Sequence, residues 1–83
     1  MFEKKVFAAR LRKLRKDAGD HQTDLAELLG VSGNQISEME NSRKTTSFER
    51  LVLLCQHYNV SADYLLGLTD EPRPLTAKEK EGI

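Results

Sequence analysis

Apolar residues in this chain recur every three or four positions, which is the period of an α-helix. Near the start, Phe7, Leu11, Leu14 and Ala18 fall on one helical face, and Lys and Arg residues occupy the other faces. Gly19 then ends this helix, because glycine readily adopts the left-handed backbone of a helix C-terminus. The same period continues along the chain, and the pattern predicts helices and no strands.

A second and a third helix follow closely. The second is expected over about residues 22–29, with Asp20 or His21 as its N-cap and Asp20 the better by residue type. Gly30 ends it. The third is expected over about residues 33–41, because Ser32 and Gln35 have the spacing of a capping box.

Three connecting residues, Gly30, Val31 and Ser32, join the second and third helices. So short a connection forces the helices to cross steeply, at roughly 90–120°, which is helix-turn-helix geometry. The Val31 side chain is expected to be buried and to hold the turn against the core. Ile36 and Met39 are expected to pack the third helix on the core.

Two more helices complete the pattern. A capping box starting at Thr46 predicts the fourth, and Asn59 ends it in a left-handed conformation. Its expected apolar stripe contains Phe48, Leu51, Leu54 or Cys55, and Tyr58. Ser61 caps a fifth helix that extends through Leu66 and ends at Gly67. Pro72 and Pro74 are expected to form a linker, and a capping box at residues 76–79 predicts the start of a sixth helix.

Composition narrows the class of protein. A length of 83 residues indicates one domain with one modest core. The single cysteine, Cys55, excludes an internal disulfide and a cysteine-based zinc site, and with no signal peptide it favours a cytoplasmic location. No uncharged stretch approaches the roughly 20 apolar residues that span a membrane.

The net charge of zero conceals an uneven distribution. Basic residues predominate in residues 1–19, whereas residues 20–42 contain five acidic residues and no Lys or Arg. Residues 43–60 are again mildly basic. The basic residues of the first helix are either a solvated face or a surface that flanks a nucleic acid.

Four motifs together resemble the Xre family, the Cro/cI-type helix-turn-helix domains of phage repressors and bacterial regulators. They lie in residues 7–15, 22–32, 35–41 and 59–67, and the resemblance covers residues 6–70. It implies an all-α, five-helix bundle of the lambda-repressor-like type that binds specific double-stranded DNA as a transcriptional regulator, with a repressor of phage or mobile-element type the leading expectation. Residues 71–83 would be a Pro-containing linker and short tail.

The resemblance also assigns roles to individual residues. The residues that it places in the major groove, where bases are read, are Ser32, Gly33, Asn34, Ser37 and Glu38. Those that it places on backbone phosphates are Gln22, Asn41, Arg43 and Lys44. Arg15 and Glu40 correspond to an ion pair that is buried in many members of the family.

The family usually binds a palindromic operator as a homodimer, and the fifth helix offers the most apolar surface for pairing. The residues of this tentative interface are Tyr64, Leu65, Leu66 and Leu68. The alternative is that all four complete the core of the monomer and that dimers form only on DNA.

Two features depart from the family and keep a second function open. Gly33 and Glu38 occupy positions where polar or basic reading residues are usual, and residues 20–42 provide no basic side chain to attract phosphate. The alternative is a protein-interaction module, such as an antitoxin-like or anti-repressor partner, that kept the fold and binds DNA weakly. An enzyme is not expected, because the sequence has no nucleophile–base pair, no phosphate-binding glycine loop and no metal-ligand spacing. No cofactor or small-molecule site is expected either.

Overall fold

A computed structural model describes residues 2–73 as five α-helices with no strand. They are α1 (Lys4–Asp17), α2 (Gln22–Leu29), α3 (Gly33–Glu40), α4 (Phe48–Tyr58) and α5 (Ala62–Leu65). This architecture confirms the predicted all-α, five-helix bundle. The expected linker at Pro74 and the expected helix start at residues 76–79 lie outside the described residues.

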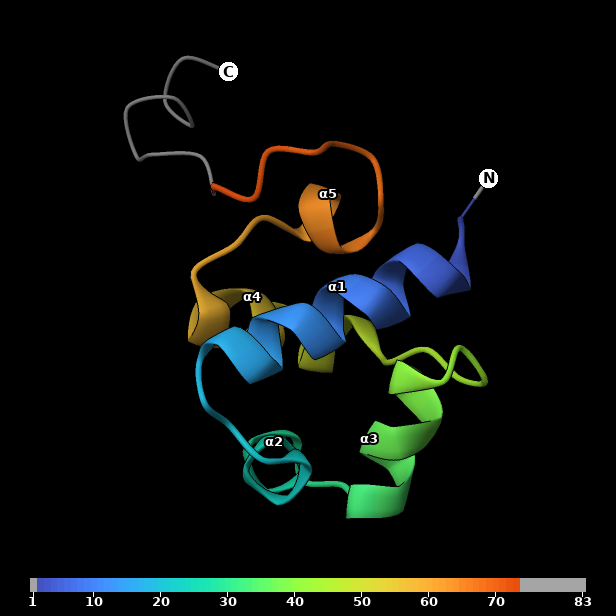
Figure 1. The fold of residues 1–83 in the computed structure, drawn as a ribbon, viewed down its shortest axis with the longest axis vertical. Coiled ribbons are helices and arrows are strands. Elements are labelled where there is room, and N and C mark those ends of the chain that lie inside the picture. Colours follow the sequence, from blue (N-terminus) through green and yellow to red (C-terminus); the bar gives the residue numbers. More distant parts are fainter. Residues whose placement is uncertain (1, 74–83) are drawn as a thin grey trace.

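The longest helix, α1, crosses the middle of the molecule (Figure 1). It contacts α3 on one side and α5 on the other, while α2 packs against both α3 and α4. The side chains buried most completely come from all five helices: Phe7, Leu11, Leu25, Ile36, Leu54 and Leu65. This single apolar core fixes α2 and α3 at the end of the molecule opposite α5.

Most helix ends lie where the local sequence places them. Gly30 adopts a φ of 69° after α2, and Asn59 adopts a φ of 54° after α4. At the start of α3, the Gln35 N–H donates to Ser32 Oγ at 3.2 Å and the Ser32 N–H donates to Gln35 Oε1 at 3.1 Å. The predicted capping box is therefore confirmed.

Asp20 does not cap α2, and the residue-type preference for it was wrong. The cap position is His21, whose N–H donates to the Asp24 carboxylate at 2.8 Å. Asp20 instead accepts a hydrogen bond from the Tyr58 hydroxyl at 3.1 Å and lies 2.9 Å from His57 Nε2. The Asp20 carboxylate thus links the connection between α1 and α2 to the end of α4.

The start of α4 also differs from the prediction. Ser47 rather than Thr46 is the N-cap, and its Oγ accepts from the Arg50 N–H at 3.2 Å. Phe48 is consequently the first residue of α4, and it projects outward with 88% of its surface exposed. The prediction that Phe48 belongs to the apolar stripe was therefore wrong, whereas Leu51, Leu54 and Tyr58 do pack on the core.

Two further apolar positions need correction. Ala18 was expected on the apolar face of the first helix, but α1 ends at Asp17 and Ala18 is exposed. Leu65 has no exposed surface and packs in the core of the monomer. Leu65 therefore cannot belong to a dimer interface, and for this residue the alternative role in the monomer core was right.

Candidate nucleic-acid interface

The exposed face of α3 follows from the helical period. Asn34, Ser37 and Glu38 lie at i, i+3 and i+4 and so share one face, while Ile36 and Met39 are buried on the opposite face. The beginning of α3, with Ser32 and Gly33, lies at the end of the molecule together with α2 (Figure 1). The five residues predicted to read bases are thus on one projecting surface, with Asn34 and Ser32 exposed and Ser37 and Glu38 half-buried.

Two of these residues contact each other. Asn34 Nδ2 donates to Glu38 Oε1 at 3.2 Å, and the other Glu38 oxygen lies 4.0 Å from Lys44 Nζ. This bond uses one of the two N–H groups of the Asn34 amide and leaves its carbonyl oxygen and second N–H for other partners. Glu38 therefore orients the Asn34 amide and carries a charge that Lys44 partly balances.

The predicted ion pair between α1 and the end of α3 is present. Arg15 Nε donates to Glu40 Oε2 at 2.6 Å and Arg15 Nη2 donates to Glu40 Oε1 at 2.9 Å. The side chains are only 11% and 4% exposed. This bidentate contact raises the pKa of the Arg15 guanidinium.

The sequence did not predict that Gln22 would join this pair. Gln22 Nε2 donates to Glu40 Oε1 at 3.1 Å, which ties the first residue of α2 to the last residue of α3. One N–H of the amide is thereby occupied, so a phosphate would be met by its second N–H and by the backbone at the start of α2.

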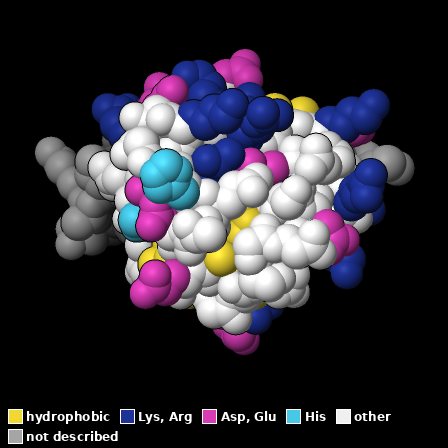
Figure 2. All heavy atoms as spheres, turned by 60° about the horizontal axis from the view of Figure 1, so that its bottom comes forward, with side chains coloured by type: hydrophobic (Ala, Val, Ile, Leu, Met, Phe, Trp, Pro, Cys, Tyr) yellow, Lys and Arg dark blue, Asp and Glu magenta, His cyan; other side chains and the backbone are white. Residues whose placement is uncertain are grey.

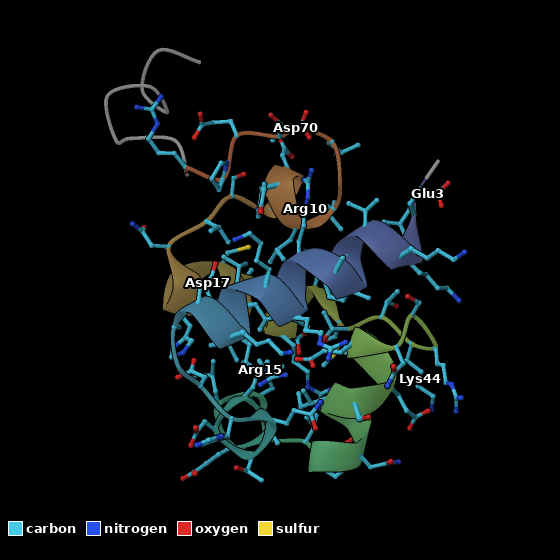
Figure 3. The ribbon with its side chains drawn as sticks, viewed as in Figure 1. Glu3, Arg10, Arg15, Asp17, Lys44 and Asp70 are labelled. Carbon is cyan, nitrogen blue, oxygen red and sulfur yellow. The ribbon has the colours of Figure 1, made fainter. Side chains whose placement is uncertain are left out.

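The loop after α3 brings the other expected phosphate residues together. Asn41 Nδ2 donates to the Ser37 carbonyl at 2.8 Å, which closes the end of α3. The backbone N–H groups of Arg43 and Lys44 donate to the Glu38 carbonyl at 2.9 and 3.3 Å, so the chain turns back beside the helix. Both basic side chains are exposed, and Figure 3 shows Lys44 beside α3.

Figure 2 shows the face formed by α2 and α3. Lys and Arg side chains gather along its upper edge, where α1 lies, and further Lys and Arg side chains, with acidic ones among them, lie at its right-hand edge. Between them the surface is mostly uncharged, while acidic and His side chains gather at the left. Basic side chains thus border this face on two sides, although residues 20–42 contain none.

The expected pairing surface is only partly exposed. The Tyr64 ring is half-buried beneath the Arg10 guanidinium, 4.3 Å from its carbon, and Leu66 is half-buried. Leu68 is 72% exposed and lines an apolar groove of about 530 Å³ with Phe2 and Phe48. The exposure of Phe2 and Phe48 was not predicted, because a helical period alone does not show which apolar residue remains uncovered.

Within residues 2–73, no cluster of three His, Cys, Asp or Glu side chains is arranged to hold a metal ion. None of the described helices combines the length and the apolar character that a membrane span requires.

Comparison with known proteins identifies the relatives of this chain. A family model described as Helix-turn-helix matches residues 11–65. The uncharacterized HTH-type transcriptional regulator YobD of Bacillus subtilis is 39% identical over 69 residues, 83% of this chain and 62% of that protein. The HTH-type transcriptional regulator ImmR of the same organism is 40% identical over 58 residues, 70% of this chain and 46% of that protein. The chain thus spans less than two thirds of either relative.

A solved structure with the same fold is that of the P22 c2 repressor protein in complex with a synthetic operator. It superposes with a TM-score of 0.69 at 34% identity, over 74% of this chain and 92% of the repressor chain. This chain thus shares its fold with a repressor whose structure was determined in complex with an operator.

Proposed function

The chain belongs to the Xre-type helix-turn-helix family, and we propose that it is a transcriptional regulator, a repressor, that binds specific sequences in double-stranded DNA. The observation that carries the proposal is the exposed polar face of α3, which projects between two groups of basic side chains (Figure 2). Major grooves admit an α-helix, and phosphates line both sides of a groove.

Base reading is assigned to Ser32, the N-cap of α3, and to the exposed face of that helix. Asn34 is the strongest candidate, because an amide can bond an adenine edge with both its oxygen and its nitrogen, worth about 1–3 kcal/mol of discrimination. The bond from Asn34 to Glu38 holds the amide in place before DNA arrives. Ser32, Gly33 and Ser37 complete the reading surface.

Phosphate contacts are assigned to the edges of the same face. Gln22 and Asn41 lie where α2 begins and α3 ends, and Arg43 and Lys44 extend from the following loop. Such contacts position the protein and do not read sequence. Removing the Lys44 charge would also leave the nearby Glu38 carboxylate without its counter-charge. Removing the Arg43 charge is therefore the cleaner test of a phosphate contact.

Specific binding further implies a homodimer on a palindromic operator. One recognition helix reads only a few base pairs, and two-fold copies about 34 Å apart would reach successive major grooves. The second copy is proposed to pack on the apolar groove that contains Phe2, Phe48 and Leu68, with Leu66 at its wall. Phe48 and Leu68 are 88% and 72% exposed and line the same groove, and exposed apolar side chains that lie together are typical of a protein–protein contact.

The experiment is a selection of bound sequences from random duplex DNA. The proposal predicts a two-fold symmetric consensus that binds at least about a thousand times more tightly than unrelated DNA. Arg43→Gln is expected to weaken binding to all sequences alike. It should also lower the slope of log affinity against log salt by about one for each bound protomer.

A selection that yields no consensus would refute specific DNA binding. The alternative function, a protein-interaction module with weak DNA binding, would then gain support. The exposed acidic residues Asp24 and Glu27 on α2 would be its recognition surface.

A further inference from the structure

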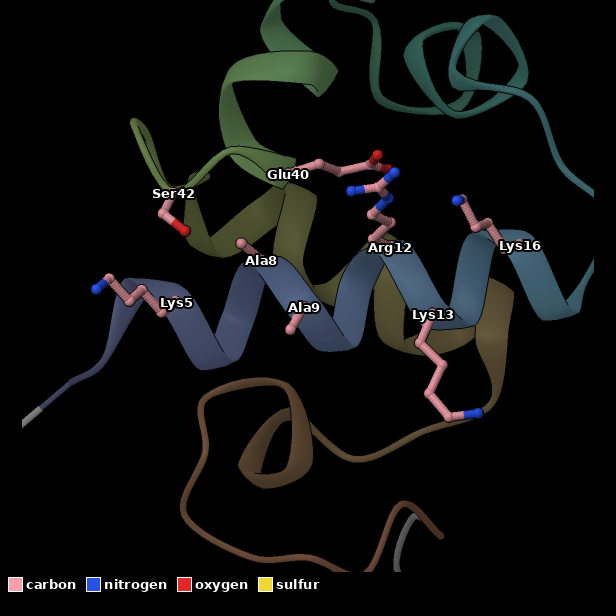
Figure 4. A pocket seen from close by; sticks show the side chains of 8 residues that line it. All are labelled: Lys5, Ala8, Ala9, Arg12, Lys13, Lys16, Glu40 and Ser42. Atoms are coloured by element: carbon pink, nitrogen blue, oxygen red, sulfur yellow. The ribbon is translucent and has the colours of Figure 1, made fainter.

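A basic hollow of about 430 Å³ follows α1 beside the end of α3. Its walls include Lys5, Arg12, Lys13 and Lys16 from α1, with Glu40 and Ser42 opposite them. Figure 4 shows Arg12 and Lys16 directed toward the side of α3, whereas Lys13 points away from it. The sequence left open whether these basic residues are a solvated face or a surface that flanks a nucleic acid.

The helical period explains which basic side chains act together. Lys5, Arg12 and Lys16 lie at i, i+7 and i+11, so they share one face of α1 and span about 16 Å along its axis. The phosphates of one DNA strand rise about 3.4 Å per nucleotide, so this row is long enough to meet more than one of them. Ala9 lines the hollow between Lys5 and Arg12, and its small, exposed side chain leaves room there for a phosphate to approach α1.

The one carboxylate in the hollow does not cancel these charges. Glu40 is only 4% exposed and receives both donors of the Arg15 fork at 2.6 and 2.9 Å. Its charge is thereby balanced within the protein. Within residues 2–73, Lys5, Arg12 and Lys16 take part in no ion pair, whereas Lys13 binds Asp17 at 2.8 Å.

Arg12 also connects this hollow to the proposed DNA surface. A second, smaller hollow of about 110 Å³ is lined by Arg12 and Arg15 together with Gln22, Glu40 and Asn41. Gln22 and Asn41 are the residues proposed to hold phosphates where α2 begins and α3 ends. Arg12 lines both hollows, so it is the member of the basic row on α1 that lies next to Gln22 and Asn41.

We propose that Arg12, Lys16 and Lys5 form a second phosphate-binding site, which contacts the DNA backbone beyond the part bound by the helix-turn-helix. The ligand is the sugar-phosphate backbone of one strand, next to the phosphates at Gln22 and Asn41. The inference rests on the proposed function, since it lengthens the same interface. It also explains how a chain with no basic residue in 20–42 retains attraction for DNA.

The test compares Arg12→Gln/Lys16→Gln with wild type and with Lys13→Gln, a control that removes a charge from another face of the same helix. Binding to the selected operator and to a scrambled duplex is measured across salt concentrations. The slope of log affinity against log salt falls by about 0.9 for each phosphate that the protein no longer neutralises. We expect a decrease of roughly 2 per bound protomer for the double variant, so roughly 4 for a dimer, and no decrease for Lys13→Gln, with equal weakening on both duplexes.

A hydroxyl-radical footprint adds a readout that a folding defect would not produce. The double variant is expected to lose protection at the outer backbone positions of each half-site and to keep it around the bases read by α3. Because Arg12 and Lys16 are exposed, its thermal melt should match that of wild type.

The outcomes separate this inference from the proposed function. If wild type binds its operator and the double variant keeps the wild-type slope and footprint, the α1 site is wrong and the proposed function stands. If wild type shows no salt-dependent binding to any duplex, both are wrong.

Discussion

Glu40→Gln should destabilise the protein strongly although it changes the shape of the side chain little. Glu40 accepts three hydrogen bonds, two from Arg15 and one from Gln22, at 2.6, 2.9 and 3.1 Å. A glutamine offers one acceptor oxygen, and its NH₂ group would face an N–H donor of one of these partners. Arg15 would then keep its charge, nearly buried, without a counter-charge.

The expected cost follows from this burial. Removing one partner of a buried pair costs on the order of 3–5 kcal/mol, because the other charge is left unpaired. A domain of 83 residues has about 4–12 kcal/mol of total stability, so this loss is at least about a quarter of it. Each kcal/mol lowers the melting temperature by about 4–8 °C in a domain of this size, so the fall should be at least about 12 °C.

Thermal and urea unfolding, followed by circular dichroism, measure this loss. Glu38→Gln is the matched control, because Glu38 is on the same helix and its nearest basic group, Lys44 Nζ, is 4.0 Å away. We expect the control to lose less than about 1 kcal/mol. Replacing both partners, as Arg15→Met with Glu40→Leu, should recover much of the loss. If Glu40→Gln and Glu38→Gln melted at the same temperature, the stabilising role of the buried pair would be refuted.

Three smaller predictions concern other contacts. The hydrogen bond to His57 lowers the pKa of Asp20, so the stability that the Asp20 carboxylate contributes is present above its ordinary pKa of about 3.9 and is lost as the pH falls through the lower folded-state pKa. In an acid titration, Asp20→Asn should therefore lose less stability than wild type as the pH falls below that ordinary value. Burial raises the pKa of the Cys55 thiol, so a thiol reagent at mildly alkaline pH should modify the native protein more slowly than the urea-unfolded chain, and equal rates would contradict this. Ser32→Ala removes the side chain that caps the Gln35 N–H and should cost about 1 kcal/mol in urea unfolding; an unchanged midpoint would show that the cap adds nothing.

Features set by neighbouring residues could be predicted from the sequence. The Ser32 capping box and the left-handed ends at Gly30 and Asn59 depend on a few adjacent positions, and the structure contains all three. The short connection likewise brings α2 and α3 together as expected. The positions on α3 follow from the same helical period, while the roles assigned to them came from the family resemblance.

Features set by distant partners could not be predicted in this way. Asp20 has the residue type of an N-cap, but His57 and Tyr58 on α4 engage its carboxylate. Phe48 and Leu65 are both apolar, yet packing leaves one outside and buries the other. The basic row on α1 was visible in the sequence, but its position beside Glu40 and Asn41 required the fold.

A double-mutant cycle, in which one change is made in the protein and one in the DNA, tests most directly whether α3 reads bases through Asn34. Affinities of wild type and Asn34→Ala are measured for the selected operator and for each single-base-pair substitution of one half-site. We predict that one adenine substitution weakens wild type about 5- to 150-fold, corresponding to about 1–3 kcal/mol, and leaves Asn34→Ala nearly unaffected. All other positions should discriminate equally in both proteins. If Asn34→Ala retained the full wild-type penalty at every position, the reading role of α3 through Asn34 would be contradicted.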